Sequence, residues 1–327
     1  MIIPAIDIMN NKVVQLKEGR DLELELDAGS IQSCFDRFSK VRNVAVIDLD
    51  AAGVGDGGNN YDLICDLVKQ KRGVIVGGGI RSVSKAKSLL HEGAYKVILG
   101  TAATPENLQH LDSDRVIAAV DVRGTEVYVN GWTEGTGENV FDRIERLKPY
   151  VNHFMVTFVD REGHGQGIDL KMARKLNEAV GDRKLTVAGG TRRVEEVGVL
   201  ESRGIDVQVG MALYKGNFTL ADVLYNSAEL QSHDSLMLIP TVVCNEDGQA
   251  LGLVYSSRES LQKSIETPYA HYQSRRRGLW KKGEESGNTQ IVQKIELDCD
   301  KDCLRFTVKQ EGKGFCHEQT KTCWDRP

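Results

Sequence analysis

Short apolar segments alternate with amphipathic segments from residue 1 to about residue 230. Nearly continuous apolar runs of this length are typical of parallel strands that are buried on both faces. A segment with helical spacing of its apolar residues follows each run, as at 82–92 and 193–203. The eight runs span residues 2–8, 44–49, 73–76, 97–99, 116–122, 153–159, 184–187 and 206–209. Eight consecutive strand–helix units predict an α/β protein with a (β/α)₈ barrel, the TIM barrel.

Three motifs of the first half of this region recur in the second half, about 110 residues later. Residues 5–8 (Ala-Ile-Asp-Ile) recur at 119–122 (Ala-Val-Asp-Val), residues 77–81 (Gly-Gly-Gly-Ile-Arg) at 188–192 (Ala-Gly-Gly-Thr-Arg), and residues 99–102 (Leu-Gly-Thr-Ala) at 209–212 (Val-Gly-Met-Ala). The alternative architecture, a doubly wound open sheet, needs a glycine-rich turn directly after the first strand, and none is present. A barrel with twofold pseudosymmetry accounts for the repeat, so we favour the barrel.

The pattern changes near residue 231, where we place a boundary between a barrel domain at 1–230 and a second domain at 231–327. A helical stretch at 220–230 leads into strand-like runs, at 238–244, 251–255, 290–297 and 304–310. The second domain is therefore expected to be small, β-rich and of the α+β type. Because so short a chain buries a limited core, we expect metal binding or dimerisation to stabilise it.

The composition excludes several classes of protein. A hydrophobic fraction of 40% and a charged fraction of 27% are ordinary for a soluble globular chain. The net charge of -5 lacks the basic footprint of a protein that binds nucleic acid. No apolar run is long enough to cross a membrane, and the first residues lack the features of a signal peptide. Since the seven cysteines are an odd number and four of them follow residue 298, we expect reduced thiols in a cytoplasmic protein.

Asp7 and Asp121 end the first and the fifth predicted strands, one in each half of the repeat. The active site of such a barrel lies where the strands end and the loops to the helices begin. We therefore expect the two carboxylates to face each other across the mouth, where they would divide the roles of general acid and general base. The alternative is that each aspartate only caps the turn after its strand.

Glycine-bearing turns follow four of the predicted strands and suit phosphate groups. Glycine lets backbone N–H groups approach an anion closely, and each turn precedes a helix whose N-terminus attracts negative charge. Any single Gly-Gly pair is equally typical of a tight turn. The duplication, however, predicts two phosphate sites on opposite sides of the mouth and a ligand with a phosphate at each end. These sites comprise Gly78, Gly79, Gly100 and Thr101 in one half and Gly189, Gly190 and Gly210 in the other.

The C-terminal region combines carboxylates and thiols at short spacing. Thiolates select zinc, whereas clustered carboxylates select magnesium or calcium, so we expect a zinc site close to a site for one of these two harder cations. A solvated acidic strand with incidental cysteines is the alternative. The candidate ligands are Asp298, Asp300 and Asp302 for the hard cation, and Cys299, Cys303, Cys316 and Cys323 for zinc.

An extended strand over residues 296–308 would place the three aspartates on one face and Cys299 and Cys303 on the other. The two cysteines would then lie about 13 Å apart, too far to share one zinc ion. We therefore assign zinc to Cys299, Cys316 and Cys323, which leaves a fourth position open for water, as in catalytic sites. The rival is a closed structural site of four cysteines, which requires the chain to bend between Cys299 and Cys303.

Two other features of this region would serve a hydrolytic site. His317, beside a ligand cysteine, would shuttle a proton from zinc-bound water, or else support a ligand or face solvent. Ser274 precedes three arginines at 275–277 and forms with them an anion-binding loop, in which Ser274 and Arg275 donate to phosphate. Nucleic-acid binding is the alternative for such a run, but the nearby acidic cluster argues against it.

Residues 1–217 resemble ProFAR isomerase of histidine biosynthesis in the segments 2–7, 48–52, 77–82, 121–123 with 131–132, and 188–190. The resemblance implies an Amadori rearrangement of a bisphosphorylated aminoaldose. Asp7 would be the general base, Asp121 the general acid with Thr157 assisting, and Trp132 would cover the substrate. Two departures are Glu162, where the family usually has aspartate, and Thr191, where an aliphatic residue is common. The alternatives are a barrel that is a silent scaffold and one that also isomerises phosphoribosylanthranilate.

Residues 238–323 resemble phosphoribosyl-AMP cyclohydrolase of the same pathway. The shared motifs lie at 253–255, 274–275, 279–280, 282–284, 286–287, 298–302 and 316–317. The resemblance implies zinc-dependent hydrolysis of the adenine ring, with magnesium at the aspartates and substrate contacts from Trp280 and Lys282. It also implies a homodimer through this domain, with zinc ligands from both subunits. Arg276 stands where the family usually has serine. Together the two resemblances predict a bifunctional enzyme.

Overall fold

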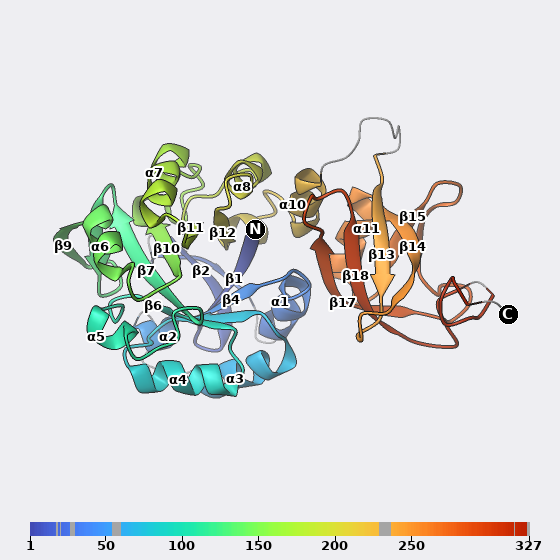
Figure 1. The fold of residues 1–327 in the computed structure, drawn as a ribbon, viewed down its shortest axis with the longest axis horizontal. Coiled ribbons are helices and arrows are strands. Elements are labelled where there is room, and N and C mark those ends of the chain that lie inside the picture. The colour runs from blue at the N-terminus through green and yellow to red at the C-terminus, as the bar shows by residue number, and fades with distance from the viewer. Residues whose placement is uncertain are drawn as a thin grey trace. The chain divides into compact units, whose positions relative to one another are not determined.

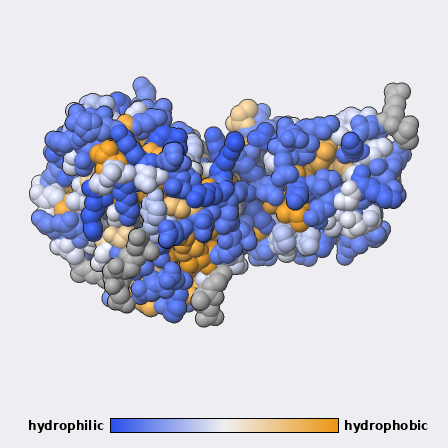
Figure 2. Space-filling model, turned by 90° about the horizontal axis from the view of Figure 1, so that it is seen from below, coloured by the Kyte–Doolittle hydropathy of each residue, from blue (hydrophilic) through white to orange (hydrophobic). Residues whose placement is uncertain are grey.

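The computed structural model describes residues 1–17, 19, 21–26, 30–53, 60–228, 237–316 and 318–325. They form two compact units, Met1–Phe35 with Asn43–Asn217, and Asp36–Arg42 with Phe218–Pro327. The domain boundary that the sequence predicts, near residue 231, lies outside the described residues. None of the described helices is long and apolar enough to cross a membrane. Hydrophilic side chains cover most of the face seen in Figure 2, and hydrophobic ones form small groups between them.

Eight parallel strands close into a barrel in the first unit (Figure 1). β10 pairs with both β7 and β11, and β1 pairs with both β12 and β4, so the ring has no open edge. The predicted fold and all eight predicted strands are therefore confirmed. The strands are β1 (Ile2–Met9), β4 (Val44–Asp48), β5 (Val74–Gly77), β6 (Lys96–Leu99), β7 (Val116–Arg123), β10 (His153–Phe158), β11 (Lys184–Ala188) and β12 (Asp206–Val209).

Helices follow the strands, and a two-stranded excursion follows the first strand of each half. The excursions are β2 (Lys12–Lys17) with β3 (Asp21–Glu25), and β8 (Glu126–Val129) with β9 (Glu134–Asn139), and neither was predicted. The helical segments are α1 (Ser30–Phe38), α2 (Leu49–Ala52), α3 (Tyr61–Gln70), α4 (Val83–Glu92), α5 (Pro105–Leu108), α6 (Val140–Leu147), η1 (Val159–Arg161), α7 (Leu170–Val180), α8 (Val194–Glu201) and α9 (Met211–Tyr214).

The interior of the barrel is filled by side chains from alternate strand positions. Ile3, Ala5, Ile117 and Ala119 are among the buried residues of this cluster. Because side chains alternate between the two faces of a strand, Asp7 and Asp121 point inward like Ala5 and Ala119, two residues before each. The packed core thus ends in a layer of polar groups at the carboxyl ends of the strands.

The second unit contains a four-stranded sheet in the order β14-β13-β18-β17. β13 (Ile239–Cys244) runs parallel to β18 (Leu304–Gln310), whereas β14 (Ala250–Ser256) and β17 (Gln290–Leu297) pair antiparallel to their neighbours. All four strands were predicted. α10 (Leu220–Ser227), α11 (Arg258–Glu266) and the hairpin of β15 (His271–Ser274) and β16 (Gly278–Lys281) complete the unit. Of these, the sequence predicted only α10.

The prediction of one extended strand over residues 296–308 is wrong. β17 ends at Leu297, β18 begins at Leu304, and these two residues face each other across an antiparallel pair. The Asp298 N–H donates to the Cys303 carbonyl over 3.0 Å, and Lys301 has φ +64°, so residues 298–303 form a tight loop. The chain therefore bends between Cys299 and Cys303, and the strand-face argument that separated these two thiols does not apply.

Candidate active sites

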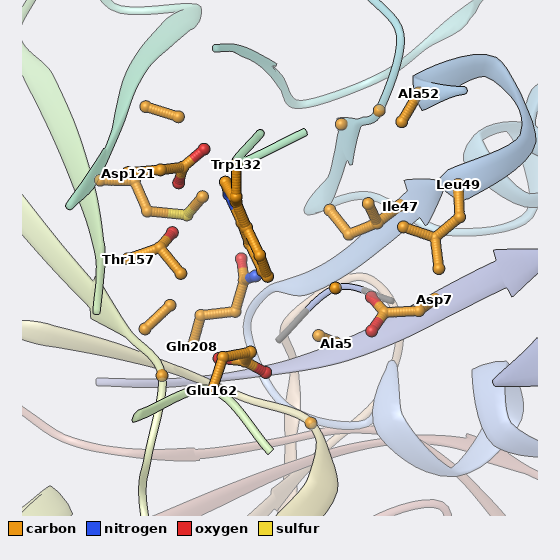
Figure 3. A pocket seen from close by; sticks show the side chains of 18 of the residues that line it. Ala5, Asp7, Ile47, Leu49, Ala52, Asp121, Trp132, Thr157, Glu162 and Gln208 are labelled. Carbon is orange, nitrogen blue, oxygen red and sulfur yellow. The ribbon is translucent and has the colours of Figure 1, made fainter. Parts of the chain in front are cut away.

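A cavity of about 700 Å³ opens at the carboxyl ends of the barrel strands. Every barrel residue predicted for the site lines it, from both halves of the repeat. In Figure 3, Asp7 and Asp121 lie on opposite sides of Trp132, and Glu162 lies below them. The predicted residues in the lining are Asp7, Gly78, Gly79, Gly100, Thr101, Asp121, Trp132, Thr157, Gly189, Gly190 and Gly210.

Asp7 is held by a buried glutamine. The Gln15 Nε2 donates to Asp7 Oδ2 over 3.2 Å and to the Val14 carbonyl over 2.8 Å. Burial raises the pKa of Asp7 to about 7, against the opposing effect of the Gln15 hydrogen bond. A carboxyl with a pKa near neutrality is suited to exchanging protons with a substrate.

Asp121 occupies the equivalent position in the second half and has different partners. Thr157 faces it in register on the neighbouring strand, β10. Burial raises the pKa of Asp121, and hydrogen bonds from Thr157 and Trp132 oppose this rise. Both strand-end aspartates therefore face the cavity rather than capping the turns after their strands.

Glu162 adds a third carboxyl to the cavity. Burial, and then the charges of Asp7 and Asp121, raise its pKa to about 8. In the sequence this position stood out only as a departure from the family pattern, because sequence alone does not determine whether a glutamate in a loop extends into the cavity. Arg81 and Arg192 also line the cavity and were not predicted for the site. The internal repeat could have identified these two arginines, because it places one arginine after each Gly-Gly turn.

The glycines of the cavity divide into two kinds. Gly78 has φ +89°, and a Cβ there would overlap the Asp48 backbone; Gly189 has φ +92°, and a Cβ there would lie 2.5 Å from the Phe158 carbonyl oxygen. Packing alone requires glycine at these two positions. Gly100 differs, because a Cβ there meets no heavy atom within 4 Å and its φ is not left-handed. Space beside the Gly100 backbone is what the close approach of a ligand needs.

Trp132 and Thr191 also line this cavity. Trp132 has φ +67°, and its ring lies against Gly19 in the turn between β2 and β3. The Thr191 hydroxyl is buried and has no hydrogen-bond partner among the described residues. Neither Thr191 nor Glu162 disturbs the facing arrangement of Asp7 and Asp121.

Three carboxylates meet in the loop between β17 and β18. One oxygen each of Asp298, Asp300 and Asp302 lies within 4.8 Å of the others, and all three residues are exposed. The charge of Asp300, followed by burial and the charge of Asp298, raises the pKa of Asp302. Mutual repulsion of this kind is relieved by a divalent cation that prefers oxygen ligands, so the donor set fits magnesium or calcium.

The candidate zinc ligands are brought together only in part. A side-chain hydrogen bond joins Cys316 and Cys323. A hydrogen bond from the backbone N–H of Glu318 lowers the pKa of Cys316, whereas burial raises the pKa of Cys323. Among the described residues, Cys299 does not come within 4.8 Å of both other thiols in one chain. His317 lies outside the described residues. A pair of thiols supplies part of the donor set that zinc prefers, and a zinc site would need further ligands.

The predicted anion-binding loop is the turn of the β15–β16 hairpin. Ser274 Oγ accepts hydrogen bonds from the backbone N–H groups of Arg276 (3.2 Å) and Arg277 (3.1 Å). The Arg275 guanidinium lies over the Tyr255 ring, 4.6 Å from its centroid, and Trp280 packs on Tyr272.

Lys282 is buried and donates to the Phe315 carbonyl over 2.7 Å. Burial lowers its pKa, and the charges of Cys323 and Cys316 oppose this effect. The structure thus brings Lys282 next to the two thiols.

Two family models match the chain. The model described as histidine biosynthesis protein matches residues 1–219, and the model of phosphoribosyl-AMP cyclohydrolase matches residues 252–325. The two matches fall on the barrel and on the β-rich region that carries the thiols and carboxylates.

Three individual proteins illustrate what the chain is similar to. The phosphoribosyl imidazole-4-carboxamide isomerase of Halobacterium salinarum is 35% identical over 232 residues, which are 68% of this chain and 94% of that enzyme. Its counterpart in Methanoregula boonei is 37% identical over 240 residues, 69% of this chain and 99% of that enzyme. The histidine biosynthesis bifunctional protein his7 of Schizosaccharomyces pombe is 53% identical over 106 residues, which are 32% of this chain and 25% of that protein.

Proposed function

Since the chain belongs to the histidine biosynthesis protein family and carries a phosphoribosyl-AMP cyclohydrolase domain, we propose that it catalyses two steps of histidine biosynthesis. The C-terminal domain opens the purine ring of phosphoribosyl-AMP by hydrolysis. The barrel isomerises the resulting aminoaldose, ProFAR, to the aminoketose. The observation that carries this proposal is the pair of inward aspartates, Asp7 and Asp121, which have raised pKa values in one cavity lined by four glycine-bearing turns.

The isomerisation uses one acid and one base. Asp121, supported by Thr157, gives a proton to the ring oxygen of the aminoaldose and opens the sugar ring. Asp7 removes the proton from C2, and the electron pair of that bond moves to form the enolamine. The enolamine becomes the ketose when C1 gains a proton and the C2 hydroxyl loses one. A pKa of about 7 keeps a useful fraction of Asp7 ionised at neutral pH.

Two pairs of glycine turns hold the two phosphates, one pair for each phosphate, and Trp132 closes over the sugar between them. Gly100 and Thr101 take one phosphate with Gly78 and Gly79, and Gly189, Gly190 and Gly210 take the other. The spacious backbone at Gly100 supports this assignment, because nothing in the protein itself requires glycine there. Arg81 and Arg192 balance the phosphate charge.

The hydrolytic site is completed by a second copy of the chain. Cys316 and Cys323 of one copy and Cys299 of another would hold zinc, which activates water at neutral pH. Asp298, Asp300 and Asp302 hold magnesium, and His317 transfers protons. Ser274, Arg275, Trp280 and Lys282 bind the nucleotide. Leu253 on β14 and Trp324, which follows Cys323 in the chain, are exposed by 55% and 62%, and this supports an interface between two copies.

None of the seven cysteines, all of them described, forms a disulfide, which supports a cytoplasmic location.

The isomerase assignment is tested by supplying ProFAR to the purified chain and measuring the aminoketose. Asp7→Asn and Asp121→Asn should each reduce kcat by about 10²-fold or more, because each removes one proton-transfer group. Asp66→Asn, an exposed aspartate on α3, is the matched control. A wild-type chain that leaves ProFAR unchanged would instead make the barrel a silent scaffold.

A further inference from the structure

The two halves of the barrel hold their aspartates with donors from different places. Asp7 receives its hydrogen bond from Gln15, on the strand β2 of the first excursion. Asp121 receives hydrogen bonds from Thr157, on the neighbouring barrel strand β10, and from Trp132. The duplication predicts equivalent partners, so this difference breaks the twofold pseudosymmetry at the residues that matter most.

Strand register shows which positions are equivalent. Asp7 pairs with Val14 as Asp121 pairs with Tyr128, so Gln15 corresponds to Val129. Asp7 pairs with Ile47 as Asp121 pairs with Thr157. Each half therefore carries a polar donor at one of the two positions and an aliphatic residue at the other, in opposite order.

The orientation of the Gln15 amide follows from its neighbours. Asp7 Oδ2 and the Val14 carbonyl are both acceptors, so the nitrogen end of the amide must face them. Gln15 is 2% exposed, and its Oε1 lies against Gly210, where any Cβ would overlap it. The amide is thus locked between β1 and the turn after β12.

Gln15 and Thr157 differ in chemistry as donors. An amide NH₂ can only donate, so it stabilises a carboxylate oxygen that carries no proton. A threonine hydroxyl can donate or accept, so it can accompany both the ionised and the protonated form of its partner. The indole N–H of Trp132, which also reaches Asp121, can only donate. Asp121 therefore has one partner, Thr157, that suits an acid which loses and regains a proton, whereas the Gln15 amide beside Asp7 suits only a base.

We propose that Gln15 is a positioning residue for Asp7: its locked amide fixes the carboxylate and commits Asp7, rather than Asp121, to accepting the substrate proton. This inference rests on the proposed isomerase function of the barrel. It goes beyond that function because it explains why Asp7 is the base and Asp121 the acid. The explanation lies in Gln15, a residue outside the barrel strands that has no polar counterpart in the second half.

Other titratable groups lie on the elements packed against β1 or line the cavity, and they must stay unchanged in any test. Asp48 on β4 and Asp50 on α2, which pack next to β1, are engaged by the Asn60 amide. Tyr214 donates to the Ala5 carbonyl over 3.1 Å. The titratable groups that line the same cavity as Asp7 are Arg81, Asp121, Glu162, His164, Arg192 and Lys215.

Gln15→Met tests the proposal, because methionine matches glutamine in length and removes the donor. The Asp7 carboxyl is titrated by ¹³C NMR in the full chain, with its signal assigned by its loss in Asp7→Asn. We expect the pKa of Asp7 to rise by about one unit, since a hydrogen bond to the charged form is lost. The acid limb of the kcat/KM profile for ProFAR should move upward with it. Val129→Leu, at the equivalent position of the other half, should leave both unchanged.

A second variant uses the broken symmetry. Adding Ile47→Thr to Gln15→Met places a hydroxyl where Thr157 stands in the other half, and it should return the pKa of Asp7 at least halfway. If Gln15→Met does not fold, Gln15→Leu takes its place. An Asp7 titration within about 0.2 units of wild type in a folded Gln15 variant overturns the proposal. The titration needs no substrate, so an inactive wild-type barrel would refute the proposed function and still leave the role of Gln15 decided.

Discussion

Replacing Glu162 with glutamine should stabilise the barrel at alkaline pH and leave its stability unchanged at acid pH. In the folded chain the pKa of Glu162 is raised from an ordinary 4.5 to about 8 by burial and by Asp7 and Asp121. Between these two values the folded protein holds a proton that the unfolded chain has released. The free energy of unfolding of the wild type therefore falls as pH rises from about 4.5 to about 8.

The size of the effect follows from the same difference. One pKa unit corresponds to about 1.4 kcal/mol, so the full difference sets a ceiling of about 5 kcal/mol. Glu162 lines a cavity that solvent enters, which screens part of this cost. We expect Glu162→Gln to gain on the order of 2 kcal/mol at pH 8 and close to nothing at pH 4.5.

Urea denaturation of the full chain at a series of pH values measures this gain. Because a chain of two units need not unfold in one step, the barrel is followed by Trp132 emission in a Trp280→Phe, Trp324→Phe background. Glu195→Gln, an exposed glutamate on α8, should change stability by less than about 0.5 kcal/mol at any pH. A gain from Glu162→Gln that is equal at pH 4.5 and pH 8 would show that this carboxyl titrates normally, and the cluster of three carboxyls would be refuted.

Two further predictions separate packing from function. Gly100→Ala should change the free energy of unfolding by less than about 0.5 kcal/mol, yet raise KM for ProFAR about tenfold or more. Gly78→Ala, whose Cβ overlaps the Asp48 backbone, should instead destabilise the barrel by about 2 kcal/mol or more. If urea denaturation shows equal effects for the two variants, the distinction is contradicted. Removing metals with a chelator should abolish ring opening of phosphoribosyl-AMP and leave isomerisation of ProFAR unchanged. Asp300→Asn should weaken the binding of Mn²⁺ measured by calorimetry, and Asp247→Asn, at an exposed aspartate, is the control. Loss of both activities on chelation would contradict the assignment of the metals to one domain.

The barrel strands could be predicted because parallel strands buried on both faces are nearly continuous apolar runs. The two excursions could not, since β3 (Asp-Leu-Glu-Leu-Glu) and β9 (Glu-Gly-Thr-Gly-Glu-Asn) are mostly exposed and become strands only through pairing. Asp7 and Asp121 were found because duplication repeats their setting. Gln15 was missed for the converse reason: a polar residue in a strand is usually solvated, and only the tertiary structure buries this one.

The C-terminal metal site shows a second limit. Alternation along an assumed strand placed Cys299 and Cys303 on one face, but the segment is a hairpin loop closed by Asp298 and Cys303. A run of aspartates and cysteines has no apolar periodicity to distinguish a strand from a turn. The clustering of Asp298, Asp300 and Asp302 survives, because a tight loop brings alternate residues together as well as a strand does.

The central claim is that one chain carries two consecutive activities. Its most direct test is to supply labelled phosphoribosyl-AMP, with Zn²⁺ and Mg²⁺, to the purified full-length chain and to identify the products by mass spectrometry and NMR. We predict that the wild type forms the aminoketose and that Asp121→Asn stops at ProFAR. Accumulation of ProFAR by the wild type, or phosphoribosyl-AMP left unconsumed, would contradict the account.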